Sequence, residues 1–387
     1  YTASGEFQIV KDGKATASGI KGTATFTPKS AVGDVKVEFK VPADLSKHLG
    51  ETWVAFETVK QGDVTVAIHA DVMDQDQTVY VPKVGTTARN GDKDLGKTVV
   101  AGGTLVDTIA YENLTPGKQY TAAGEFMAMI NDKPVPTGVV GTATFTPKAA
   151  NGTVDVQFKV PADLKANAGH SWVAFETVKQ GSVIVAIHAD VTDQAQTVWA
   201  PKIGTSLYGP NKENGPRATV DAQGGVTLVD TIGYQGLQPG QKYVATGEIM
   251  FNDGKSTGIT SSQEFTADKA DGTVDVKFNV PGDLLDQGSV LVVAYESVAL
   301  ASKPGTPVAT HQDLNAESQQ LVLSFGSGAP AVPNSGGGGQ VPSGLGADGH
   351  GVNPALVGGG IALLLLLAGV GIFLANRRRR QDEVETD

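Results

Sequence analysis

The sequence predicts an all-β protein made of tandem Ig-like β-sandwich domains, followed by one C-terminal transmembrane helix. Three observations predict this fold class: a repeat of domain length, hydrophobic residues that alternate along short segments, and turn dipeptides between those segments. A chain of 387 residues is long enough for about two to four domains.

The repeats are read directly from identical segments. GTATFTPK occurs at 22–29 and at 141–148, and WVAFETVKQG occurs at 53–62 and at 172–181, both offset by 119 residues. A diverged third copy follows, because TLVDTI at 104–109 returns in the next unit as the same six residues. We therefore predict a truncated, a complete and a diverged repeat, called repeats 1, 2 and 3: residues 1–82, 83–201 and 202–324.

Short alternating segments predict the strands of each repeat. Val35–Val41, Val154–Val160 and Val274–Val280 place apolar residues at every second position, which buries one face of an antiparallel sheet. Pro-Gly pairs at 116–117 and 239–240 separate neighbouring segments as turns. About 120 residues of such strands per unit is typical of an Ig-like sandwich.

The C-terminal part has a different composition. Gly, Pro, Ser and Asn dominate 325–354, which we interpret as a linker. The uncharged, apolar segment 355–375 is long enough to span a bilayer. Because Arg377–Arg380 follow it, the tail 376–387 is expected in the cytoplasm and the repeats outside the cell.

The same arrangement of apolar segment and basic tail is found in sortase substrates of Gram-positive bacteria. Their LPxTG-type motif has only loose counterparts here, within 332–344. Sortase attachment to peptidoglycan and a retained membrane anchor are therefore both open.

Charge and cysteine content narrow the class of protein. The net charge of −11 argues against binding to nucleic acid, whose phosphates require a basic surface. The chain has no Cys, so an extracellular domain must be stabilised without disulfides. This favours some other covalent brace. No cofactor and no metal is predicted.

Each of the first two repeats ends with the pattern His-x-Asp-x-x-Asp-x-x-Gln-Thr. In repeat 2 it contains His188, Asp193 and Gln196, and the eight-residue spacing would let His188 and Gln196 share one face of a strand. Spacing alone leaves three interpretations open: a buried hydrogen-bond network, cross-link chemistry and a metal site. One His per repeat provides fewer ligands than a zinc site usually has, and the Asp spacing is not that of a calcium loop.

Further motifs make a family resemblance specific. VAFE stands at 54–57 and 173–176, and LVDTIxY at 105–111 and 228–234. With the His/Asp/Gln pattern, residues 1 to about 324 resemble the VaFE-repeat family of Gram-positive surface-anchored adhesins. The resemblance implies an intramolecular ester between a Thr near the start of the first strand and a Gln on the last.

The resemblance also implies site residues, position by position. In repeat 2 the nucleophile would be Thr86, with Thr87 as the alternative, and the electrophile Gln196. Its supporting groups would be Asp107, Glu176, His188 and Asp193. In repeat 3 the corresponding residues are Thr205, Asp230, Glu296, His311 and Gln319.

Repeats 1 and 3 depart from this set. In repeat 3, Ala316 replaces the second acid, and Glu317 next to it is a candidate substitute. Repeat 1 keeps an incomplete site: Glu57, His69, Asp74 and Gln77. Because Tyr1 aligns with Tyr120, its Thr and first acid would precede residue 1, and we expect an incomplete domain.

The function expected from these features is a structural stalk of a bacterial cell-surface adhesin. It would be braced by autocatalytic Thr–Gln esters, formed once per domain, and would not be an enzyme. An adhesive region before residue 1 would bind a host or environmental surface ligand. The alternative is a ligand-binding adhesive module with uncross-linked sandwiches. A secreted enzyme is disfavoured, because no Gly-x-Ser-x-Gly motif and no Cys nucleophile occurs.

Overall fold

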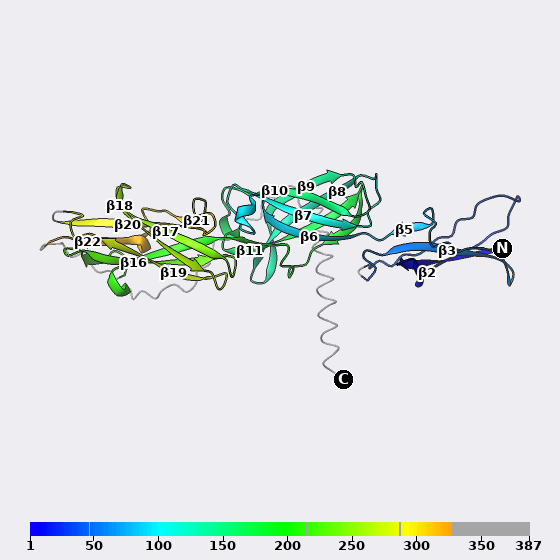
Figure 1. Cartoon of the computed structure of the whole chain (residues 1–387), viewed down its shortest axis with the longest axis horizontal. Helices are drawn as coiled ribbons and strands as arrows, with labels where there is room; N and C mark the ends of the chain where they lie inside the picture. The colour runs from blue at the N-terminus through cyan, green and yellow to red at the C-terminus, as the bar shows by residue number, and fades with distance from the viewer. Residues whose placement is uncertain (46, 214, 286–287, 327–387) are drawn as a thin grey trace, which may run out of the picture. The chain divides into compact units, whose positions relative to one another are not determined.

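The computed structural model describes residues 1–45, 47–213, 215–285 and 288–326, all within one compact unit, Tyr1–Val332. The described residues are all-β, with strands joined by turns and short 3-10 segments (Figure 1). The sheets of each repeat are built only from strands of that repeat. Tandem β domains are therefore present, as the sequence predicts.

Repeat 2 contains two antiparallel sheets. The smaller has the order β10-β7-β6, and the larger the order β12-β11-β8-β9, with β13 also paired to β11. The strands and 3-10 segments are β6 (Lys83–Asn90), η1 (Lys93–Leu95), β7 (Thr104–Glu112), β8 (Tyr120–Ile130), β9 (Lys133–Phe145), β10 (Gly152–Lys159), η2 (Lys165–Asn167), β11 (His170–Gln180), β12 (Val183–His188) and β13 (Thr197–Ala200).

Repeat 3 has the same two-sheet plan with one additional strand. Its small sheet is β14-β16-β19, and its large sheet is β15-β22-β20-β17-β18, with β21 also paired to β20. The elements are β14 (Lys202–Tyr208), η3 (Pro210–Lys212), β15 (Thr219–Asp221), β16 (Val226–Gln235), β17 (Lys242–Phe251), β18 (Ser256–Thr266), β19 (Gly272–Val280), β20 (Ser289–Leu300), β21 (Pro307–His311), η4 (Glu317–Gln319) and β22 (Gln320–Ser324).

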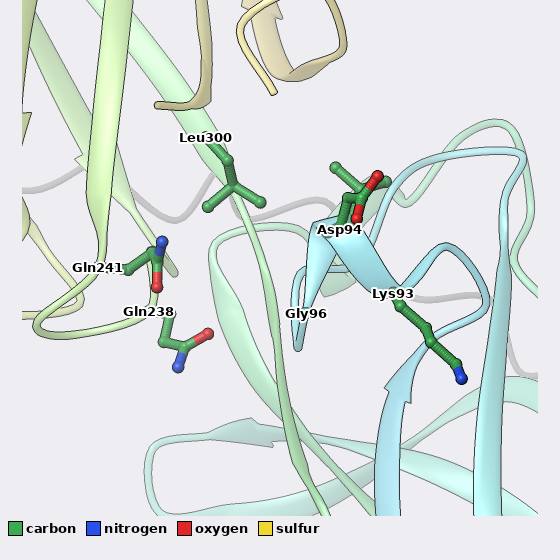
Figure 2. A pocket seen from close by; sticks show the side chains of 7 residues that line it. Lys93, Asp94, Gly96, Gln238, Gln241 and Leu300 are labelled. Atoms are coloured by element: carbon green, nitrogen blue, oxygen red, sulfur yellow. The ribbon is translucent and has the colours of Figure 1, made fainter. Parts of the chain in front are cut away.

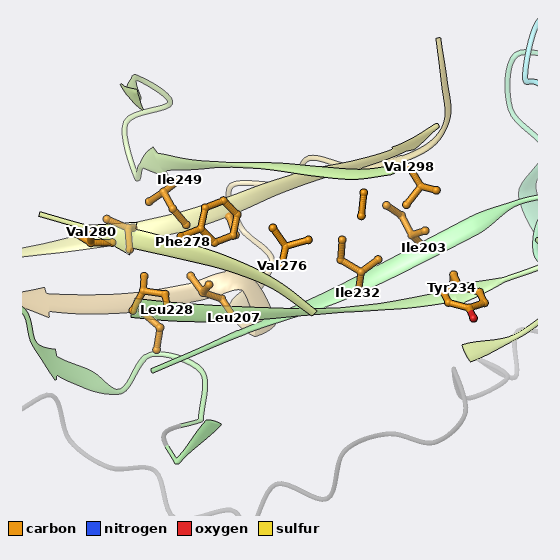
Figure 3. Close-up of a cluster of buried hydrophobic side chains, with 14 of the residues drawn as sticks. Ile203, Leu207, Leu228, Ile232, Tyr234, Ile249, Val276, Phe278, Val280 and Val298 are labelled. Carbon is orange, nitrogen blue, oxygen red and sulfur yellow. The ribbon is translucent and has the colours of Figure 1, made fainter. Parts of the chain in front are cut away.

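Period-two alternation places the hydrophobic core between the two sheets. In repeat 2, Phe126 from the large sheet and Phe158 from the small sheet are fully buried, with ring centroids 4.9 Å apart. In repeat 3, the side chains of Ile232, Ile249 and Phe278 fill the same layer (Figure 3). Each buried side chain of this size contributes about 1.5–3 kcal/mol of transfer free energy, so both repeats have a core of their own.

Repeat 1 forms a single sheet. Its strands are β1 (Thr2–Lys11), β2 (Lys14–Thr25), β3 (Thr52–Gln61), β4 (Val64–His69) and β5 (Thr78–Tyr80), in the order β2-β1-β3-β4 with β5 on β3. Its core cluster is small, and every residue of β4 is exposed. In the part of repeat 1 that the structure describes, no second sheet covers one face of this sheet as in repeats 2 and 3.

The prediction of a strand at Val35–Val41 is wrong. In the structure this segment is irregular, with one isolated bridge between Gly22 and Phe39. Its counterpart β10 pairs with β7, whereas, apart from that bridge, no strand of the described residues pairs with Val35–Val41. Alternation alone does not make a strand, because its backbone groups also need a partner strand.

The predicted C-terminal features lie outside the described residues. These are the segment 355–375, the tail 376–387, the region 332–344 and nearly all of the linker. Within the described residues, no helix has the length and apolar character needed to cross a membrane.

Candidate functional site

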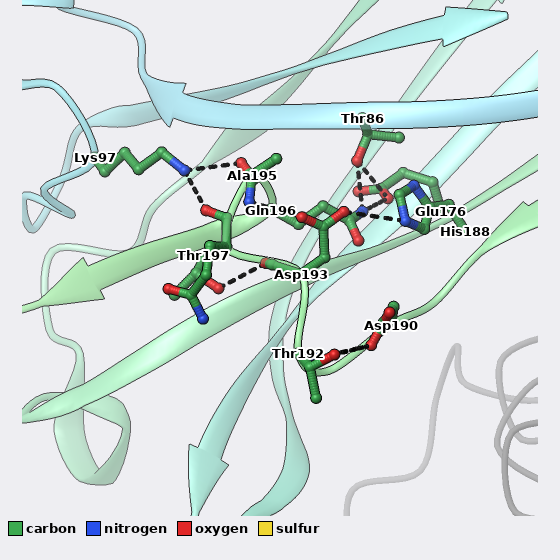
Figure 4. A network of polar contacts seen from close by, with 11 residues as sticks. Thr86, Lys97, Glu176, His188, Asp190, Thr192, Asp193, Ala195, Gln196 and Thr197 are labelled. Carbon is green, nitrogen blue, oxygen red and sulfur yellow. Dashed lines mark hydrogen bonds and ion pairs between the residues drawn. The ribbon is translucent and has the colours of Figure 1, made fainter. Parts of the chain in front are cut away.

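The candidate site of repeat 2 lies between its two sheets (Figure 4). The small sheet supplies Thr86 from β6 and Asp107 from β7, and the large sheet supplies Glu176 from β11. The exposed fractions of Thr86, Asp107 and Glu176 are 5, 0 and 1%. Three polar side chains are thus held in the core, where each needs a partner.

Thr86 and Thr87 point in opposite directions, because successive side chains of a strand alternate. Thr86 and Ala88 are buried, whereas Thr87 between them is exposed. Thr86 Oγ1 lies 2.5 Å from Gln196 Nε2 and 3.4 Å from Glu176 Oε2. The geometry therefore brings Thr86, and not Thr87, to the glutamine.

Gln196 is fully buried and lies directly before β13. Its Nε2 atom is 2.5 Å from Glu176 Oε2, and its carbonyl Oε1 has no donor among the residues described. The expectation that Gln196 shares a strand face with His188 is wrong. β12 ends at His188, and the chain turns before it reaches Gln196.

That turn also places Asp193. Asp193 Oδ1 accepts a hydrogen bond from the Ala195 backbone N–H at 2.7 Å, and Asp193 Oδ2 lies 3.2 Å from His188 Nε2. The carboxylate thus orients the imidazole of His188 and shapes the turn that carries Gln196. The bend of the chain after His188 brings Asp193 back to the histidine.

The strand register explains how Glu176 fits beside the histidine. Glu176 pairs with Gly124 on one side and with His188 on the other. A Cβ atom at Gly124 would lie 3.0 Å from Phe158 Cζ and 3.2 Å from Glu176 Cγ, so glycine leaves the room that the glutamate and the core ring occupy. Sequence reasoning missed this glycine, although its recurrence in the Tyr-Thr-Ala-x-Gly-Glu-Phe segments of repeats 1 and 2 was visible.

Asp107 and Glu176 form a buried carboxyl pair. Burial and the adjacent Asp107 raise the pKa of Glu176 well above its ordinary value, and burial raises the pKa of Asp107. Two neighbouring buried carboxyls cannot both ionise. The pair therefore retains one proton, which the raised pKa values place in the buried site at neutral pH.

Repeat 3 assembles the corresponding groups. Thr205 Oγ1 lies 3.0 Å from Glu296 Oε2 and 3.2 Å from His311 Nδ1. Gln319 is fully buried and donates from Nε2 to Glu296 Oε2 at 2.6 Å. Burial and Asp230, itself fully buried, raise the pKa of Glu296 to about 11. Burial lowers the pKa of His311, so the imidazole is neutral at physiological pH.

The substitute acid suggested for repeat 3 is not placed at the histidine. Glu317 is exposed and pairs with Arg217 at 2.8 Å. The negative charge of Asp313 raises the pKa of His311 and so offsets part of the lowering caused by burial. Among the described residues, no carboxylate is paired with His311 as Asp193 is paired with His188.

Repeat 1 brings its four predicted residues together on an open sheet. His69 Nε2 lies 3.0 Å from Asp74 Oδ2. With its amide oriented to satisfy its neighbours, Gln77 donates to Glu57 Oε2 at 2.6 Å. Burial raises the pKa of Glu57. Four of the six groups are thus present, and among the described residues no threonine and no counterpart of Asp107 joins them.

No cluster of metal-ligating side chains emerges from the described residues. Their His, Asp and Glu side chains do not gather in any group of three or more that could hold a metal ion. A small pocket of about 110 Å³ is lined by Lys93, Asp94, Leu95, Gly96, Gln238, Gln241 and Leu300 (Figure 2). It includes none of the predicted site residues.

Comparison with solved structures finds bacterial proteins at low identity. An adhesin from Mobiluncus mulieris, described as containing intramolecular disulfide, isopeptide and ester bond cross-links, is 14% identical, with a TM-score of 0.27 over 63% of this chain and 98% of that one. The C-terminal domain of the Streptococcus agalactiae AgI/II polypeptide BspA is 10% identical, with a TM-score of 0.30 over 62% of this chain and 100% of that one. No curated protein matches.

Comparison with protein families gives a match in every repeat. The model of the T-Q ester bond containing domain matches residues 1–81, 82–200 and 201–323, which together make up most of the chain. The chain therefore belongs to the family of T-Q ester bond containing domains.

Proposed function

We propose that repeats 2 and 3 each form an intramolecular ester, joining Thr86 to Gln196 and Thr205 to Gln319. The observation that carries this proposal is the 2.5 Å separation of Thr86 Oγ1 and Gln196 Nε2 inside a fully buried site. Membership of the T-Q ester bond family supports the same pair.

The reaction is an acyl transfer within the domain. Thr86 Oγ attacks Cδ of Gln196, and a tetrahedral intermediate forms. The C–N bond then breaks, the hydroxyl proton passes to the departing nitrogen, and ammonia leaves. The product is an ester and the balance is one chain minus one ammonia. A carboxamide is a poor electrophile, so both groups need activation.

The carboxyl pair supplies the acid. A protonated Glu176 or Glu296 can donate its O–H to the glutamine carbonyl once the carboxamide turns its oxygen toward it, because the two ends of an amide are interchangeable in shape. That hydrogen bond strengthens as charge develops on the oxygen, in a site shielded from water. Asp107 or Asp230 holds the proton on the glutamate through its own negative charge.

The histidine is the proposed base. His311 Nδ1 lies within hydrogen-bond distance of Thr205 Oγ1 and is neutral, so it can accept the hydroxyl proton and return it to the leaving nitrogen. His188, oriented by Asp193, would act in the same way in repeat 2. The glutamates cannot take this role while they carry a proton.

The ester consumes both of its residues, so each domain reacts once and does not turn over. Burial excludes the water that would hydrolyse the product. The bond closes a loop between residues 110 positions apart. By analogy with a disulfide, such a loop stabilises the folded state by about 4–5 kcal/mol.

In the cell, we propose that the repeats form the stalk of a surface adhesin. The absence of Cys supports a brace of another kind, and a cross-link near both ends of a domain suits a protein under tension. The apolar segment 355–375 would anchor the stalk in the membrane. Release of the repeats from cells by a muramidase, but not by detergent, would instead identify attachment to peptidoglycan.

Intact-mass spectrometry of the purified chain tests the ester. The expected mass is that of the sequence minus two molecules of ammonia, and peptide mapping should recover Thr86 joined to Gln196 and Thr205 joined to Gln319. A chain with the unmodified mass would refute the proposal.

A further inference from the structure

Lys97 contacts the turn that carries the reacting glutamine. It lies two residues after η1, and its Nζ donates to the backbone carbonyl oxygens of Gln194 and, at 3.0 Å, of Ala195 (Figure 4). These are the two residues before Gln196. No motif in the sequence marks this lysine, which lies 99 positions earlier in the chain.

The same turn is also hydrogen-bonded to β6, the strand that carries Thr86. The carbonyl oxygen of Ala195 also accepts the backbone N–H of Ala88 at 3.0 Å, and Ala88 is two residues from Thr86 on the same face of β6. The Ala195 carbonyl thus accepts two hydrogen bonds, one from β6, the strand of the nucleophile, and one from the ammonium of Lys97. A charged donor makes the stronger of these hydrogen bonds, roughly twice a neutral one.

Repeat 3 provides an internal comparison. The Trp199 N–H donates to the Lys97 carbonyl, and the Val322 N–H donates to the Ala218 carbonyl. Trp199 and Val322 each lie three residues after the glutamine of their repeat, so Ala218 occupies the position of Lys97. The cation next to it, Arg217, pairs with the exposed side chain of Glu317 in the glutamine turn of repeat 3, and among the described residues its side chain donates to no carbonyl of that turn.

The reacting groups differ in the same way. Gln196 Nε2 lies 2.5 Å from Thr86 Oγ1. In repeat 3, Gln319 Nε2 donates to the Ala294 carbonyl and to Glu296, and across the described residues no hydrogen bond joins Gln319 to Thr205. The turn whose carbonyls are held by a lysine presents its glutamine to the threonine, and the turn whose cation contacts only an exposed side chain does not.

We propose that Lys97 is a positioning residue for ester formation in repeat 2. It holds the carbonyls of the Gln196 turn against β6 and so keeps the carboxamide carbon within reach of Thr86 Oγ. Lys97 touches neither reacting atom. This inference rests on the proposed ester, and it makes repeat 2 faster to cross-link than repeat 3.

The test compares rates of cross-linking in the whole chain. Unreacted chain, isolated in urea, is refolded by dilution, and ammonia loss from each repeat is followed by quenched peptide mapping. Lys97→Met keeps the length and stem of the side chain and removes the charge. It should slow the Thr86–Gln196 ester by about tenfold or more, since small misplacements of reacting groups cost about that much or more, and leave repeat 3 unchanged.

Two controls separate positioning from general destabilisation. Lys97→Arg retains a charged donor and should react at nearly the wild-type rate, and Lys93→Met, an exposed change in the same segment, should have no effect. In a Thr86→Ala background, where no ester can form in repeat 2, Lys97→Met and Lys97→Arg should unfold at similar urea concentrations.

The outcomes that overturn the inference are distinct from those that overturn the ester. A wild-type rate in Lys97→Met refutes positioning while the ester stands. Slow reaction in both Lys97 variants, with an equally lowered urea midpoint, assigns Lys97 a structural role only. A wild-type chain that never loses ammonia from repeat 2 refutes both the ester and the role of Lys97.

Discussion

Thr86 and Thr87 are chemically equivalent neighbours, and only the direction of their side chains distinguishes them. Thr86 is 5% exposed and contacts Gln196, whereas Thr87 lies on the solvent face of β6. The sequence left both open, because the strand phase is set by which face meets the second sheet. At this scale, one residue of register decides which hydroxyl is a nucleophile.

Substitution of the two threonines should therefore have opposite results. Thr86→Ala should leave repeat 2 with its ammonia, so the mass deficit of the chain relative to its own sequence falls from two molecules of ammonia to one. Thr87→Ala should have the same number of esters as the wild type. Thr86→Ser, which retains a hydroxyl, is the matched control and should still cross-link. Loss of the ester in Thr87→Ala, with the ester kept in Thr86→Ala, would reverse the assignment.

The pKa shifts in repeat 3 predict how its reaction depends on pH. The base must be neutral His311, whose pKa burial lowers below 6.5, and the acid must be protonated Glu296, whose pKa is about 11. The reactive form is therefore fully present from about pH 7 to 9 and is lost as the pH falls through the pKa of His311.

Refolding of unreacted chain into buffers of different pH measures this directly. The rate of ester formation in repeat 3 should be constant from pH 7 to 9 and should fall by up to about tenfold per pH unit at acidic pH, as the base is protonated. His311→Gln, which removes the base, should react slowly at every pH. A rate that stays constant down to pH 4 would show that His311 is not the base.

At the scale of strands, one glycine creates the space beneath each glutamate. Gly247 pairs with Glu296 as Gly124 pairs with Glu176. A Cβ atom at Gly247 would lie 2.5 Å from Phe278 Cζ, a distance that the buried ring could relieve only by moving within the core. The glycine is required by close packing, since its backbone φ is not in the left-handed region.

Gly247→Ala should consequently destabilise repeat 3. In a Thr205→Ala background, where the ester cannot mask the effect, we expect a loss of about 1–3 kcal/mol in the free energy of unfolding, as for other overpacked cores. The urea midpoint measures it. Gly233→Ala in β16, where the nearest atom to the new Cβ is 3.5 Å away, is the control and should unfold at or above the parent midpoint. Equal midpoints for both variants would contradict this packing argument.

The sequence predicted the strands at Val154–Val160 and Val274–Val280 because alternation and a partner strand coincide there. It failed at Val35–Val41, where the same alternation has no partner in the described structure. It also placed His188 and Gln196 on one strand, since spacing cannot distinguish a straight strand from a strand followed by a turn. The contact of Lys97 with the glutamine turn could not be predicted from the sequence, because a contact between residues 97 positions apart is set by tertiary packing.

At the scale of the chain, the two proposed esters define where tension would run. Thr86 lies in the first strand of repeat 2, and Gln196 lies nine residues before Thr205 in the first strand of repeat 3. A force applied along the chain would cross from Thr86 to Gln196 through the ester and then continue to Thr205. The residues between Thr86 and Gln196 would bear none of it.

Single-molecule force spectroscopy should reveal this path. With the ester present, stretching should show no extension step from the interior of repeat 2, because a covalent bond bypasses its sheets. Thr86→Ala should add one unfolding step, which releases about 110 residues. At about 3.4 Å per residue this corresponds to roughly 370 Å of added contour length. Thr87→Ala is the control with the ester intact, and a step of this length in that variant or in the wild type would mean that repeat 2 unfolds between its ends and that no cross-link carries the load.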